Sequence, residues 1–293
     1  MDNSPKVYLK SLKKFFIIFI LIASFFIFSI LISQKPTFNL NQLSYKEKHQ
    51  LNNFLEYILL REGGVYVLFG SKPVVCSNLC IISEEKIKNS SPEIPENIKK
   101  NTVRQKIKLD FYLQDWEQVQ KYFKIKNKFL LFFKRHEEDG IASVYLINKP
   151  NLITVLTEYY SVFKERTKID FNPLTIFDEF NNESSSFWNL VQKDMLLQGL
   201  IFGYGFVNSS LFDQWLKLSK TEALNFENLG FKSIGKHLVD KNIKVNYQNF
   251  SLPVFRSFPN DPTLEKYKNE RKKIKALYRG RNSLKVTLRE LCE

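Results

Sequence analysis

The sequence is poor in the residues from which metal centres and nucleophilic sites are usually built. Its 293 residues include three cysteines and three histidines, namely Cys76, Cys80, Cys292, His49, His136 and His237. No histidine has a second histidine at metal-ligand spacing, and the Gly-x-Ser-x-Gly motif of the α/β hydrolases does not occur. The sequence therefore predicts no metal and no cofactor, and it identifies no catalytic nucleophile.

Two glycine-rich stretches lack the features of nucleotide-binding loops. Five residues rather than four separate Gly64 from Gly70, Lys72 does not directly follow a glycine, and Pro73 removes a backbone donor. The stretch 203–208 (GYGFVN) lacks the third glycine of a dinucleotide fingerprint and follows a helical pattern rather than a strand. We interpret the first stretch as a turn and the second as close helix packing that leads into a glycine-rich turn.

Charged residues are absent from residues 15–33 (FFIIFILIASFFIFSILIS). As a helix this segment would be about 28 Å long, close to the hydrocarbon thickness of a bilayer. Four lysines precede the segment and one follows closely, namely Lys6, Lys10, Lys13 and Lys14 before it and Lys35 after it. The positive-inside bias therefore places the N-terminus in the cytoplasm and the bulk of the chain outside it.

Two interpretations of this span remain open, an uncleaved signal anchor and a cleaved secretory signal. We favour the anchor because the apolar run exceeds the usual signal core of about 7–15 residues and no small-x-small cleavage site follows. The sequence then divides into a cytoplasmic basic tail (1–14), a single-pass transmembrane signal anchor (15–33), a juxtamembrane linker (34–50) and an extracytoplasmic domain (51–293). A charged, proline-containing segment at 83–101 indicates an exposed loop or lobe boundary.

The extracytoplasmic part mixes strand and helix patterns without a repeating β-α unit, which predicts an α+β fold with a mostly antiparallel sheet and packed helices. The spacing predicts strands at 65–69, 74–82 and 107–113, the second pairing back on the first, and a hairpin of 128–135 with 141–148. It predicts helices at 51–60, from Asp115 to Phe123, from Asn151 to about 166, at several places in 172–219 with Ser185 and Asn208 or Ser209 as caps, and after Asp261-Pro262 up to Gly280. Residues 245–258 read as extended.

Cys76 and Cys80 lie four residues apart, in a compartment where thiols can oxidise. A disulfide across a tight turn is one alternative. If both residues continue a single strand, their Cα atoms lie too far apart to be bridged. Both alternatives stay open.

Carboxylates supply the remaining candidates for chemistry. His136 is followed by Glu137, Glu138 and Asp139, the densest polar cluster of the chain, and Asp178 and Glu179 form a second pair. Either group could support acid–base catalysis, so an extracytoplasmic hydrolase acting on envelope material is the alternative function. A solvated hairpin tip also explains the first cluster.

Positive charge is concentrated near the C-terminus. The net charge is +14, and residues 264–289 hold ten cations against two anions. Such a face can pack on the domain, dimerise or lie on anionic lipid, while nucleic acid is not expected across the membrane. The residues expected to contact an anionic surface are Lys268, Arg271, Lys272, Lys275, Arg279 and Arg281.

Three stretches carry a resemblance: GGVYVLFGSKPV (63–74), LIFGYGFVNSSLFDQ (200–214) and LPVFRSFPNDPTLEKYKNERKKIKALYRG (252–280). They resemble segments of a group of uncharacterised, N-terminally membrane-anchored bacterial proteins, to which no activity is attached. The resemblance implies a bacterial source. The sequence favours a non-catalytic binding or envelope-associated role with a protein partner or anionic lipid, and it does not fix the oligomeric state.

Overall fold

A computed structural model describes residues 40–80, 116–136, 141–235 and 246–292. The span at 15–33, the segment 83–101, the strand expected at 107–113 and the cluster Glu137–Asp139 lie outside these residues. Within the described part, no helix is both long enough and apolar enough to cross a bilayer. The anchor therefore stays a prediction.

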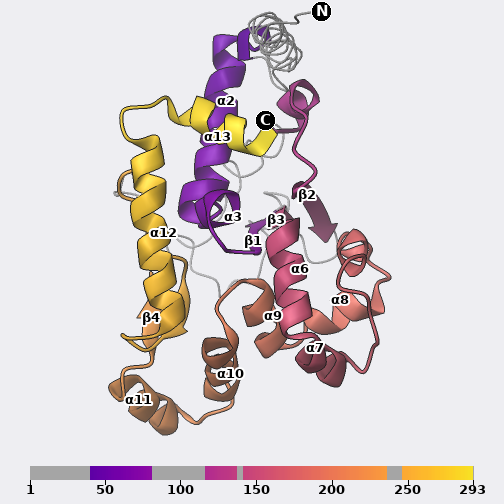
Figure 1. The fold of residues 1–293 in the computed structure, drawn as a ribbon, viewed down its shortest axis with the longest axis vertical. Coiled ribbons are helices and arrows are strands. Elements are labelled where there is room, and N and C mark those ends of the chain that lie inside the picture. Colours follow the sequence, from indigo (N-terminus) through magenta and orange to yellow (C-terminus); the bar gives the residue numbers. More distant parts are fainter. Residues whose placement is uncertain (1–39, 81–115, 137–140, 236–245, 293) are drawn as a thin grey trace, which may run out of the picture.

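The described residues form an α+β fold in which many short helices surround a small antiparallel sheet (Figure 1). The helices of the first half are η1 (Leu40–Gln42), α2 (Tyr45–Glu56), the π-helix η2 (Tyr57–Arg61), α3 (Val65–Phe69), η3 (Gln120–Tyr122), α6 (Lys149–Glu158) and α7 (Tyr160–Thr167). Those of the second half are η4 (Ile176–Glu179), α8 (Ser186–Val191), α9 (Met195–Ile201), α10 (Phe206–Trp215), α11 (Lys220–Asn228), α12 (Pro262–Tyr278) and α13 (Ser283–Cys292). The predicted fold class is confirmed at this level.

The central sheet has the strand order β1-β3-β2, and both pairings are antiparallel. Its strands are β1 (Val74–Cys80), β2 (Phe129–His136) and β3 (Ile141–Asn148). The pair β2–β3 is the predicted hairpin, with Phe129 opposite Asn148 and His136 opposite Ile141. A second, two-stranded sheet joins β4 (Lys232–Ile234) to β5 (Phe255–Ser257).

Both faces of the central sheet are covered, which explains why its strands are apolar runs rather than alternating patterns. One face contributes Val75, Val144 and Leu146 to a cluster with α2, α3, α12 and α13. The other face contributes Val74 and Ile147 to a cluster with α6, α7, α8 and α9. The sheet is thus the middle layer between two helical layers.

The strand predicted at 65–69 is wrong, because these residues form helix α3. Val65 to Leu68 are all buried, so the helix has no polar face and shows no helical period in the sequence. Gly63 has a φ of +80° and lets the chain turn directly from η2 into α3. Consequently β1 pairs with β3 rather than with 65–69.

The predicted N-caps of two helices, α6 and α10, are also wrong. The cap of α6 is Asn148, whose side chain accepts a hydrogen bond from the Asn151 backbone at 3.2 Å, and Pro150 fills the first turn. Helix α10 begins after Gly205, at a φ of +78° and without a side-chain cap. Asn208 and Ser209 therefore lie inside the helix rather than ahead of it.

Other caps follow the sequence rules. Ser185 caps α8, and Asp261 caps α12 by accepting from the backbone N–H groups of Thr263 and Leu264. α12 ends just before Gly280, as predicted. The expected close packing at Gly199 is confirmed, since a Cβ there would lie 2.4 Å from Ser209 Oγ of the neighbouring α10.

Candidate functional site

The three stretches singled out in the sequence, 63–74, 200–214 and 252–280, converge on one region of the fold. Lys72 Nζ donates to the Phe202 carbonyl at 2.7 Å, and Tyr267 Oη donates to the next carbonyl, Gly203, at 2.8 Å. The Ser71 backbone N–H donates to Glu270 Oε1 at 3.1 Å. Lys72 and Tyr267, which are 130 and 64 residues from their partners in the sequence, thus fix the corner between α9 and α10.

Glycine is required at this corner. Gly203 has a φ of +77°, and a Cβ there would lie 2.6 Å from Tyr267 Oη and 2.8 Å from Pro73 Cδ. Because Gly203 has no side chain, Tyr267 and Pro73 can pack directly against its backbone. Phe202 and Tyr204 lie on either side of this glycine. The G-x-G pattern therefore serves packing rather than phosphate binding.

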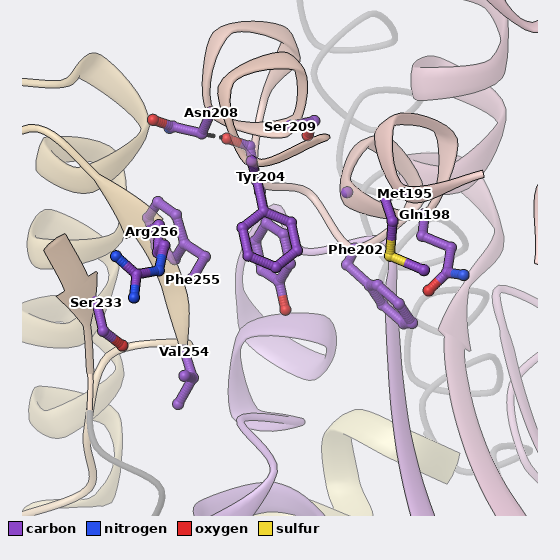
Figure 2. Close-up of a pocket in the computed structure, with 12 residues that line it drawn as sticks. Met195, Gln198, Phe202, Tyr204, Asn208, Ser209, Ser233, Val254, Phe255 and Arg256 are labelled. Atoms are coloured by element: carbon purple, nitrogen blue, oxygen red, sulfur yellow. Dashed lines mark hydrogen bonds between the residues drawn. The ribbon is translucent and has the colours of Figure 1, made fainter. Parts of the chain in front are cut away.

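A cavity of about 380 Å³, named here the aromatic pocket, lies between α9, α10 and the β4–β5 sheet. Figure 2 shows Met195, Gln198 and Phe202 on one side, Arg256, Ser233 and Val254 on the other, and Tyr204 between them. Phe212 and Phe255 add further aromatic surface. A mostly apolar lining with a few polar groups is typical of small-molecule sites.

The polar groups of the aromatic pocket differ in how they are satisfied. Arg256 is held by Glu227 at 2.8 Å and lies 3.8 Å from the ring centre of Trp215. Asn208 is 2 % exposed and donates to Asp261 Oδ1 and to the Tyr204 carbonyl. Its Oδ1 has no hydrogen-bond partner among the described residues. This oxygen is itself buried, so it does not offer an acceptor to the cavity.

A smaller cavity of about 160 Å³, named the polar hollow, adjoins the aromatic pocket. The two share Phe202, Tyr204 and Val254 as lining residues. The polar hollow is further lined by Arg61, Glu62, Gly63, Lys72, Val75, Cys76, Ser251, Leu252 and Pro253. Its charged residues are therefore two cations and one carboxylate.

Lys72 is the most unusual group at the site. It is 2 % exposed, and its ammonium lies 4.5 Å from the ring centre of Tyr204 and 5.6 Å from that of Phe202. No carboxylate among the described residues forms an ion pair with it. Burial, with a smaller effect of the Lys266 charge, lowers the pKa of Lys72 to about 7. Buried charges are normally paired.

The structure does not form the disulfide considered for Cys76 and Cys80. Both residues belong to β1, opposite Tyr145 and Ile141 of β3. Four residues of strand separate their Cα atoms by about 13 Å, whereas a disulfide needs about 4.4–6.8 Å. Cys76 keeps its thiol, and burial raises the pKa of that thiol to about 11. It is therefore not an activated nucleophile.

Of the carboxylates proposed for hydrolysis, the structure describes Asp178 and Glu179, and neither lines the aromatic pocket or the polar hollow. Asp178 and Glu179 lie exposed in η4. Glu179 accepts a hydrogen bond from Ser185 Oγ at 2.8 Å, next to the N-terminus of α8. Within the described residues, no group of three or more His, Cys, Asp or Glu could hold a metal ion.

The basic residues expected to contact an anionic surface do not share one site. Lys268 pairs with Glu265 at 2.6 Å, and Lys275 lies 5.9 Å from the Phe250 ring centre. Arg281 lines a separate cavity of about 860 Å³ beside α13, named the basic hollow. Its lining consists of Phe69, Lys126, Leu277, Arg281, Asn282, Lys285, Val286, Arg289 and Glu290. Of the six residues, only Arg281 belongs to it.

Sequence reasoning missed the central residues of the site. In the sequence, Lys72 stands out only beside an incomplete phosphate-loop pattern, and no motif marks Phe202, Tyr204 or Arg256. The signal that could have found them is the set of three resembling stretches, since these are the segments that meet. Comparison of the chain with protein-family models, curated proteins and solved structures found no match.

Replacing Lys72 by Met should change how stability depends on pH. The unfolded amine titrates near 10.5 and the folded one at about 7, so between these values the unfolded chain binds more protons. The unfolding free energy of the natural protein should therefore rise relative to Lys72→Met from pH 7 to 10, by up to about 1.4 kcal/mol per pH unit.

Urea unfolding of both proteins at pH 6 to 10 measures this difference. The exposed Lys266→Met is the matched control and should give a curve nearly parallel to that of the natural protein, because the Lys266 charge is the smaller cause of the lowered Lys72 pKa. Parallel curves for Lys72→Met would show that Lys72 titrates as it does in the unfolded chain.

Proposed function

We propose that residues 40–292 form a binding domain whose small-molecule ligand occupies the aromatic pocket, and that residues 15–33 hold this domain at a membrane. The observation that carries the binding role is the pocket itself. Its walls come from α9, α10 and the β4–β5 sheet. Hydrogen bonds from Lys72 and Tyr267 fix the α9–α10 corner, which carries the lining residues Phe202 and Tyr204. A pocket held in this way needs little rearrangement to bind, which favours affinity.

Binding can be measured without knowing the natural ligand. The chain has three tryptophans, Trp116, Trp188 and Trp215, which 5-fluorotryptophan labelling turns into ¹⁹F NMR probes. Trp215 stacks on Phe212 and Arg256, which line the pocket, whereas Trp116 and Trp188 are buried elsewhere. Titration with 4-phenylbutyramide should shift the Trp215 signal saturably at millimolar concentration and leave the other two unchanged.

A filled pocket supplies the control. Ser233 lines the pocket, while its neighbour Lys232 on β4 does not, because successive strand residues point to opposite faces. Ser233→Phe should abolish the Trp215 response and Lys232→Phe should keep it. A response that survives in Ser233→Phe would place the binding elsewhere and reject this function.

Membrane attachment rests on the uncharged 19-residue run and on the lysines that precede it. The resemblance to anchored bacterial proteins supports the same topology, with the binding domain on the outer side of the cytoplasmic membrane. In this arrangement the ligand would be a solute of the cell envelope or its surroundings.

Fractionation of cells that express the full chain tests the anchor. The protein should remain in the membrane after alkaline carbonate extraction, and deletion of residues 15–33 should release it. External protease should degrade the domain in cells whose outer layers are opened but whose cytoplasmic membrane is intact. Full-length protein in the soluble fraction would contradict the proposal.

The basic hollow supports a second candidate role, binding to anionic lipid. Lys126, Arg281, Lys285 and Arg289 line it, and its one carboxylate, Glu290, already pairs with Lys128. Phe69, Leu277 and Val286 give it an apolar part as well. This composition suits an anionic headgroup with part of its chain.

Residues 34–293 should sediment with phosphatidylglycerol vesicles but not with phosphatidylcholine vesicles, and binding should weaken as salt rises. Arg281→Gln with Lys285→Gln should reduce binding several-fold. Lys268→Gln with Lys272→Gln, which removes equal charge outside the hollow, should reduce it less. Equal losses in the two double variants would indicate diffuse attraction and exclude a site at the hollow.

A further inference from the structure

We propose that the polar hollow binds the carboxylate of an amphipathic organic acid, with Lys72 as its counter-ion and the aromatic pocket holding the apolar body of the same molecule. This inference rests on the proposed binding function and names the class of ligand. It also gives Lys72 a role that the fold alone does not require.

The fold uses only part of what Lys72 offers. An ammonium has three donors, and one of them reaches the Phe202 carbonyl at 2.7 Å. The rings of Phe202 and Tyr204 add cation–π attraction. No carboxylate of the described residues neutralises the charge. A neutral donor such as glutamine could make the same hydrogen bond to the Phe202 carbonyl. The buried charge therefore indicates that its counter-ion is a bound anionic ligand rather than a carboxylate of the protein.

The lining of the polar hollow favours a monoanion. With Lys72 protonated, Arg61 and Lys72 contribute two positive charges and Glu62 one negative charge, so the hollow carries a net charge of +1. The hollow, at about 160 Å³, has room for a carboxylate and a few waters, since one water occupies about 30 Å³ of the liquid. A dianion such as phosphate would exceed this charge and would also face Glu62.

Continuity with the aromatic pocket determines the rest of the ligand. Phe202, Tyr204 and Val254 line both cavities, so one molecule can lie across them with its charged end at Lys72. The aromatic pocket, at about 380 Å³, is large enough for an aryl or branched alkyl body.

A matched pair of probes tests the charge. The full chain in phosphatidylcholine nanodiscs, labelled with 5-fluorotryptophan, is titrated at pH 6.5 with 4-phenylbutyrate and separately with 4-phenylbutyramide. The two have the same shape and differ in charge. The acid should bind at least about tenfold more tightly than the amide, because its hydrogen bond to Lys72 is charge-assisted.

The variants Lys72→Met and Lys72→Gln should lose this preference and keep binding of the amide, which also shows that the pocket is intact. Lys266→Met, which removes a nearby exposed charge, should keep the preference. Lys72→Gln removes the charge but retains a donor for the Phe202 carbonyl, so it tests the charge alone. It also replaces Lys72→Met if that variant does not fold.

Each other outcome decides against the inference. Equal affinities of acid and amide in the natural protein, or a preference that persists without Lys72, would overturn it and leave the binding function standing. Binding of neither compound would reject the inference and the proposed function together.

Discussion

Two consecutive backbone carbonyls at the end of α9 hold the molecule together where its distant segments meet. Lys72 takes the first and Tyr267 the second, and Tyr66 packs edge-on against Tyr267 in the same buried cluster. Because the corner after α9 has glycine at Gly203 and Gly205, the backbone can approach both side chains closely. The loop between α3 and β1, the α9–α10 corner and α12 are thereby fixed against one another, and both cavities form around this junction.

The central sheet determines where that junction lies. Its two faces are covered by different helical layers, α2, α3, α12 and α13 on one side and α6 to α9 on the other. The polar hollow is lined by Lys72, Val75 and Cys76, at the start of β1, and it adjoins the aromatic pocket between α9, α10 and the β4–β5 sheet. Binding groups from both layers can therefore face one ligand, although neither layer contains a recognisable motif of its own.

Local signals predicted a good part of the fold. Features that depend only on residues close in sequence are predicted correctly. These are the helix caps Ser185 and Asp261, the hairpin of β2 and β3, and the end of α12 before Gly280. The errors lie where tertiary contacts decide. The run Val65–Phe69 is buried on every side and carries no period, and Asn208 turns its side chain to Asp261, 53 residues away. The site was missed for the same reason: Lys72 becomes unusual only once Phe202 and Tyr204 enclose it.

Helix α12 links the two ends of the molecule at which ligands are proposed. Its N-cap, Asp261, bonds to Asn208 at the aromatic pocket, and Leu277 near its last turn lines the basic hollow. Seventeen residues of helix make a rod of about 25 Å between them. The two proposed ligand sites thus lie at opposite ends of one helix, about its own length apart, so both can be occupied at once.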